Sequence, residues 1–216
     1  MSALQQSRYL EALGIEVFRL RRTEVDTPVG KDGWERLAAD VKGCKLCSLH
    51  QTRTQTVFGV GRHDADLMII GEAPGADEDR QGEPFVGRAG QLLNAMLRAI
   101  GLAREDVFIA NILKCRPPNN RDPEPAETAH CTPYLERQIA LAAPRAMLAV
   151  GRIAAQHLLQ SDQAIGRLRG KALRFGTERI PIVATYHPAY LLRAPSAKAK
   201  AWQDLCLVRQ LITEKR

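Results

Sequence analysis

Residues 67–75 read LMIIGEAPG, four apolar residues that pass directly into a turn bounded by two glycines. A short continuous apolar run is typical of a strand that is buried on both faces of a sheet. Three further runs of this kind predict strands, at 107–110, 146–150 and 180–184. Segments with helical periodicity lie between and after them, at 89–100, 124–142, 153–159 and 197–213. This alternation predicts an α/β fold with parallel strands.

Glycine, amide and imidazole groups follow three of these strands. The turn 71–75 ends the first strand, Asn111 ends the second, and His187 follows the last. Right-handed crossovers place the carboxyl ends of parallel strands at one edge of the sheet, so we expect these residues to lie together. Ligands of open α/β sheets bind at that edge, which makes it the predicted site.

The charge of the chain indicates the kind of partner. Among 216 residues, 31 Lys and Arg outnumber 24 Asp and Glu, which gives a formal charge of +7. This balance favours an acidic partner, and nucleic acid first. No apolar run reaches the ~18 residues of a membrane span, and the first 20 residues lack the pattern of a secretory signal. We therefore expect a cytoplasmic protein that contacts no membrane.

Four of the five cysteines are predicted to hold a metal centre. Cys44 and Cys47 form a C-x-x-C pair, and Cys115 and Cys131 follow far downstream. All-thiolate sites suit both zinc and iron–sulfur clusters, and four unrelated thiols are the third possibility. Zinc ribbons usually have two short knuckles, whereas 15 residues separate the second pair here, which favours a cluster. The metal would tie the amino-terminal segment to the loop after the second strand.

Two polar residues at the predicted edge fit recognition of a nucleobase. The amide of Asn111 presents a donor and an acceptor side by side, which complement O4 and N3–H of uracil and mismatch cytosine. His187 could polarise a carbonyl or stabilise an anion. A turn-initiating asparagine and a structural histidine are the simpler explanations, and these residues alone do not decide between the two.

Neighbouring segments also have one structural and one functional explanation each. The turn 71–75 is ordinary, or its N–H groups meet a ligand. Phe85 is a local core plug, or a platform on which a base stacks. The acidic run 77–79 is solvated, or it holds a divalent cation. Leu191 and Leu192 begin the last helix, or they form an exposed wedge.

Four motifs in this order resemble the family 4 uracil-DNA glycosylases, the iron–sulfur branch of the uracil-DNA glycosylase superfamily. They are CKLC at 44–47, GEAPGADEDRQGEPFVGRAGQLLNAML at 71–97, NILKCRPPNNRDPEPAETAHC at 111–131 and HPAYLLR at 187–193. The resemblance runs from about Gly43 to Val208. It divides the chain into an amino-terminal extension, 1–30, and a uracil-DNA glycosylase-like domain, 31–216.

The resemblance implies a three-layer α/β/α sandwich around a four-stranded parallel sheet. It also implies a four-iron–four-sulfur (4Fe-4S) cluster with a structural role. The cluster would be held by Cys44, Cys47, Cys115 and Cys131.

The implied reaction is hydrolysis of the N-glycosidic bond of uracil in DNA, which leaves an abasic site. The uracil pocket consists of the backbone of Gly71, Glu72 and Ala73 with the side chains of Phe85, Asn111 and His187. Phe85 would stack on the base, Asn111 would read its edge, and His187 would hydrogen-bond O2. Ala73 stands where the best-known family of the superfamily has a water-orienting aspartate. Glu72 is our first candidate for that role, before Glu78 and Asn120.

The resemblance also suggests how DNA binds. The base must be flipped out of the duplex, and Leu191 and Leu192 would fill the vacated stack. Phosphate contacts are expected from Arg116, Arg121, Arg193 and Lys198, and Glu78 would exclude the methyl group of thymine. We expect a monomer that acts on single- and double-stranded DNA. The alternatives are a related glycosylase with another or broader base preference, a non-catalytic DNA-binding module, and an iron–sulfur redox protein.

Overall fold

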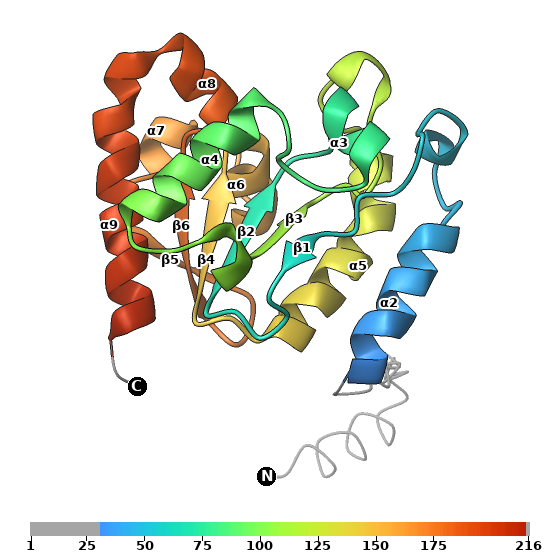
Figure 1. Ribbon diagram of the computed structural model, residues 1–216, viewed down its shortest axis with the longest axis horizontal. Coiled ribbons are helices and arrows are strands. Elements are labelled where there is room, and N and C mark those ends of the chain that lie inside the picture. Colours follow the sequence, from blue (N-terminus) through green and yellow to red (C-terminus); the bar gives the residue numbers. More distant parts are fainter. Residues whose placement is uncertain (1–30, 215–216) are drawn as a thin grey trace, which may run out of the picture.

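A computed structural model describes residues 31–214 of the chain, and the expected amino-terminal extension, 1–30, lies outside them. Its centre is a six-stranded sheet with the order β1-β3-β2-β4-β6-β5 (Figure 1). The four predicted strands form its parallel middle, which confirms the predicted fold. They are β2 (Leu67–Gly71), β3 (Phe108–Asn111), β4 (Ala146–Val150) and β6 (Ile180–Thr185).

Two short antiparallel strands border the parallel strands and were not expected. They are β1 (Val60–Gly61), which pairs with β3, and β5 (Ala172–Phe175), which pairs with β6. Each occupies an outer edge of the sheet, so the parallel strands are all interior. The described residues contain no helix that is long and apolar enough to span a membrane.

Alternate residues of each parallel strand enter two separate cores. Met68 and Ile70 of β2 face a core shared with one set of helices, and Leu67 and Ile69 face the other set. The first set is α2 (Lys31–Gly43), α5 (Pro125–Ala142), α6 (Arg152–Leu159) and α7 (Ile165–Leu168). The second set is α4 (Arg88–Ala99), α8 (Pro188–Arg193) and α9 (Lys198–Thr213). The molecule is therefore a three-layer sandwich, and Figure 1 shows α4 in front of the sheet and α9 along its left side.

A short helix, α3 (Ala76–Gln81), follows β2 and contains the acidic run 77–79. The run has structural partners. Asp77 pairs with Arg80, and both carboxylate oxygens of the buried Asp79 accept the N–H of Thr54 at 3.0 Å. The remaining turns of helix are η1 (Ser48–Gln51), η2 (Arg104–Asp106), η3 (Pro118–Asn120) and η4 (Pro195–Ala197).

Candidate active site

A cavity of about 550 Å³ opens at the carboxyl ends of the parallel strands. Three strand ends contribute to it, with Glu72 after β2, Asn111 at the end of β3 and His187 after β6. Phe85 and Ala73 line the same cavity, and Gly71 lies directly behind it. The structure thus brings together the residues proposed from sequence for the uracil pocket.

Asn111 presents its amide to this cavity from a buried backbone. The residue is 3% exposed, and its amide makes no hydrogen bond within the described part of the chain. The backbone around it is fixed, because Ile112 N donates to Gly71 O and Leu113 N donates to Glu72 O, each at 3.0 Å. A buried amide with free hydrogen-bonding capacity in a cavity is suited to reading the edge of a ligand.

Phe85 reaches the cavity through an unusual backbone. Its φ of 53° is in the left-handed region, which non-glycine residues seldom adopt. The loop is held by Arg104, which donates to the carbonyls of Pro84 and Phe85. A Cβ atom on Gly90 would lie 1.8 Å from the Phe85 carbonyl oxygen, so only glycine allows this approach. The Phe85 ring is thereby held 5.7 Å from the His187 ring.

The hydrogen bonds of His187 determine which ring nitrogen carries its proton. His187 precedes α8, and its Nδ1 accepts the N–H of Ala189 at 3.2 Å. The neutral ring therefore carries its proton on Nε2. Burial, followed by the positive charge of Arg193, lowers the pKa of His187 to about 4. At neutral pH the residue is an uncharged donor through Nε2.

Two glutamates line the cavity, and their surroundings differ. Glu78 is occupied, since Oε2 accepts from Gly75 N at 3.1 Å and Oε1 accepts from Val86 N and Gly87 N at 3.0 and 3.2 Å. The Glu72 carboxylate makes no hydrogen bond among residues 31–214. Burial and then Asp122 raise the pKa of Glu72, and Arg152 opposes them.

Of the four residues proposed to contact phosphates, two line the cavity. Arg193 and Arg121 line the cavity, although Arg121 also makes a bidentate bond to Glu127 at 2.6 and 2.9 Å. Arg116 lies outside the lining and donates to Asn120 at 2.8 Å, and Lys198 lines a separate groove between α4 and α9.

Of the two proposed wedge residues, only Leu192 is presented to solvent. It is 39% exposed, whereas Leu191 is 1% exposed and packs against α4 and α9 in the second core. Leu191 therefore has no surface to offer a DNA duplex. Sequence reasoning did not single out the neighbouring Tyr190 as an aromatic contact; it is 42% exposed and lines the cavity. The position of Tyr190 within the motif HPAYLLR was the feature of the sequence that could have indicated such a contact.

The four cysteines of the predicted metal centre line one small cavity, together with Lys114, His130 and Tyr134. Burial raises the pKa of Cys131 to about 11 and also raises the pKa of Cys115. Hydrogen-bond donors lie beside the sulfurs, since Lys114 N donates to Cys131 Sγ at 3.2 Å and Arg53 Nη1 donates to Cys115 Sγ at 2.9 Å. Within the described residues, no three His, Cys, Asp or Glu side chains converge as ligands of a single metal ion.

Lys114 joins this cavity to the end of β3 and was not identified from sequence as a site residue. The side chain is 1% exposed, and Nζ donates to Asn111 O at 2.7 Å and Gln138 Oε1 at 2.6 Å. Burial lowers the pKa of Lys114 to about 8. In the sequence, the indication of this role was the position of Lys114 between Asn111 and Cys115. The burial of Lys114 could not be predicted, because it depends on α5.

Comparison with known proteins identifies the class to which this fold and site belong. Residues 58–206 match the family described as the uracil DNA glycosylase superfamily.

Three relatives are each described as a type-4 uracil-DNA glycosylase. The protein of Archaeoglobus fulgidus is 43% identical over 187 residues, covering 83% of this chain and 94% of its own. That of Sulfurisphaera tokodaii is 42% identical, covering 86% of this chain and 88% of its own. That of Thermotoga maritima is 44% identical, covering 74% and 83%. The chain belongs to the type-4 uracil-DNA glycosylase family.

Proposed function

We propose that this chain is a monofunctional uracil-DNA glycosylase, which hydrolyses the N-glycosidic bond of uracil in DNA and leaves an abasic site. The observation that carries the proposal is the free amide of Asn111 in the same cavity as Phe85 and the uncharged His187. A base inside a duplex cannot reach such a cavity, so the nucleotide must be flipped out of the stack. No lysine lines the cavity within the described chain, in keeping with hydrolysis without a Schiff base.

The uracil is held on three sides. Asn111 pairs with O4 and N3–H, the Phe85 ring stacks on the base, and the backbone at Gly71–Ala73 borders it. His187 Nε2–H donates to O2. When the C1′–N1 bond breaks, its electron pair moves to uracil, and the donor at O2 stabilises the negative charge that develops there. The sugar becomes an oxocarbenium ion, and water then adds to C1′.

Glu72 is our candidate to position that water and accept its proton. Of the two acids that line the cavity, Glu72 is the one with a free carboxylate, because Glu78 is engaged by three backbone N–H groups. A raised pKa makes Glu72 a stronger base than an exposed glutamate. The Asn120 side chain is engaged by Arg116, which leaves it a weaker candidate.

DNA would lie across the cavity mouth. Arg193, Arg121 and Arg116 are proposed to contact phosphates, so binding should weaken as salt concentration rises. Leu192 would enter the base stack when uracil leaves it. We propose that single- and double-stranded DNA are substrates and that the protein acts as a monomer. The glycosylase domain would begin near residue 31, because Trp34 of α2 belongs to the first core.

We propose that the four cysteines bind a 4Fe-4S cluster. The four cysteines line one small cavity, and a 4Fe-4S cluster takes four cysteine thiolates as its ligands. The 15 residues between Cys115 and Cys131 favour a cluster over the two short knuckles of a zinc ribbon. Cys44 and Cys47 follow α2, whereas Cys115 follows β3 and Cys131 lies in α5. The cluster, when bound, would hold these segments together.

An oligonucleotide assay tests the activity. Iron-loaded protein should release uracil from single-stranded and duplex oligonucleotides and make the strand sensitive to alkali, without added metal. Matched oligonucleotides with thymine, cytosine or hypoxanthine in the same position test base preference. Asn111→Asp should relax or abolish selectivity for uracil. Folded, iron-loaded protein that binds these oligonucleotides and cleaves none would contradict the proposal and identify a DNA-binding module.

A further inference from the structure

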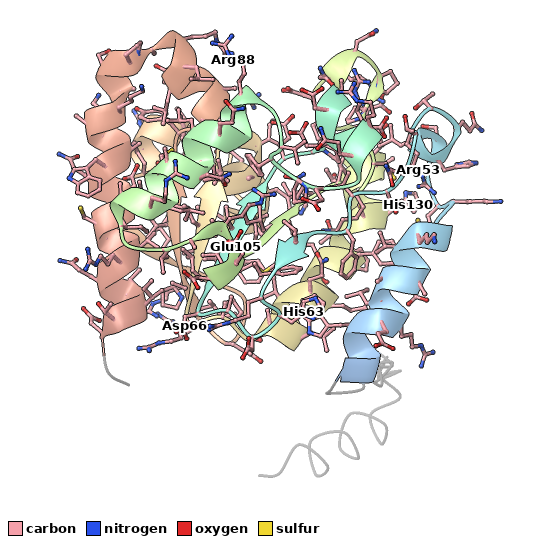
Figure 2. All side chains as sticks on the ribbon, in the orientation of Figure 1. Arg53, His63, Asp66, Arg88, Glu105 and His130 are labelled. Atoms are coloured by element: carbon pink, nitrogen blue, oxygen red, sulfur yellow. The ribbon has the colours of Figure 1, made fainter. Side chains whose placement is uncertain are left out.

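Arg53 connects two of the segments that carry the cysteines. Its Nη1 donates to Cys115 Sγ at 2.9 Å, and its Nη2 donates to the carbonyl oxygen of Cys44 at 2.8 Å. One planar guanidinium thus contacts the loop after β3 and the loop after α2. Figure 2 shows Arg53 near His130, beside the carboxyl end of α2.

The position of Arg53 is fixed and its charge is not balanced by an acid. Its backbone N–H donates to Leu49 O at 3.1 Å, at the end of η1. Between residues 31 and 214, no carboxylate forms an ion pair with Arg53. A guanidinium is always protonated in proteins, and a partly buried charge needs an opposite charge or strong acceptors nearby. The acceptors here are a cysteine sulfur and the backbone of a second cysteine.

We propose that Arg53 is the counter-charge of the cluster and controls how tightly the cluster is held and how readily it is reduced. This inference rests on the proposed cluster. Four thiolates outweigh the positive charge of the cluster core, so the bound centre is negative overall. A hydrogen bond from a cation withdraws electron density from Cys115 Sγ and favours the reduced cluster, which raises its reduction potential. The second bond, to Cys44, holds the amino-terminal pair of cysteines against the downstream pair.

The test compares Arg53→Met, Arg53→Lys and the control Arg62→Met with the wild-type holoprotein, all purified without oxygen. Arg62 is exposed and, among the residues that the structure describes, forms an ion pair only with Asp64, so its substitution makes the same change in net charge away from the cysteines. The measurements are iron per chain, the rate at which visible absorption disappears in a chelator, and the midpoint potential of the cluster.

Arg53→Met should release iron about 10-fold faster or more and shift the potential to a more negative value, because the loss of a group that hydrogen-bonds to a metal ligand typically changes metal affinity by 10- to 100-fold. The iron-release rate and the potential of Arg53→Lys should lie between those of the wild type and those of Arg53→Met, because an ammonium keeps the charge but cannot reproduce both bonds of a planar guanidinium. Arg62→Met should match the wild type.

Wild-type iron retention and potential in Arg53→Met would overturn the proposal. If Arg53→Met does not fold, Arg53→Lys decides, and wild-type values in that variant would overturn it. Iron-free wild-type protein would overturn the cluster and the role of Arg53 together, and this outcome differs from the first because no iron is present in any variant.

Discussion

Gly71→Ala tests the geometry on which base recognition depends. A Cβ atom at this position would lie 2.4 Å from Asn111 Oδ1 and 2.7 Å from Phe85 Cζ. Ordinary contact between heavy atoms requires about 3.5 Å, so the amide must retreat by about 1 Å. A misplacement of about 1 Å at a reacting site can cost about 100-fold in rate, equivalent to about 2.7 kcal/mol of transition-state stabilisation.

The assay is single-turnover release of uracil from a duplex oligonucleotide with enzyme in excess. Gly71→Ala should lower the single-turnover rate constant by about 100-fold, and its thermal unfolding should show that the protein is folded. Gly166→Ala is the matched control, because a Cβ atom there meets nothing within 4 Å. Equal rates for Gly71→Ala and the wild type would refute the reasoning that the Asn111 amide and the Phe85 ring are used in their observed positions.

Three further predictions concern residues around the cavity. Because burial holds the pKa of His187 at about 4, against about 6.5 in the unfolded chain, only the unfolded state gains a proton between these values. Stability should therefore fall by up to about 3 kcal/mol as pH falls from 7 to 4, and His187→Gln should remove that part of the decrease in urea unfolding. His187→Ala should slow cleavage about 100-fold while binding of uracil-containing duplex stays within about twofold, as judged by fluorescence anisotropy; an unchanged rate would remove His187 from the mechanism. Leu191→Ala should cost about 2–5 kcal/mol of stability because it leaves a core cavity, whereas Leu192→Ala should leave stability unchanged and slow only duplex cleavage; duplex cleavage at the wild-type rate would show that Leu192 does not enter the stack.

The parallel strands were predictable because each is a continuous apolar run buried on both faces. The edge strands were not. β1 contains only two residues, and β5 alternates exposed and half-buried positions next to solvent. Both form because a neighbouring strand offers free backbone groups, which is information held by the tertiary structure.

In the candidate site, too, some features could be predicted from the sequence and others depend on the tertiary structure. Asn111 and His187 could be placed by reading strand ends, since topology fixes where those ends meet. The left-handed backbone of Phe85 depends on Arg104 and Gly90, neither of which is adjacent to it in sequence. The burial of Leu191 and the exposure of Leu192 depend on how α8 lies against α4, and a six-residue helix is too short for periodicity to reveal it.

The ladder between β2 and β3 pairs Gly71 with Asn111 and continues past both strands through the carbonyls of Gly71 and Glu72. Asn111, which is proposed to choose the base, and Glu72, which is proposed to direct water, therefore lie at neighbouring positions of one hydrogen-bonded backbone ladder. A change in this backbone that alters the choice of base would also displace Glu72 and the water that it is proposed to position. Substitutions that alter base preference without loss of rate should therefore be found among the side chains that border the pocket, and rarely in the backbone at the ends of β2 and β3.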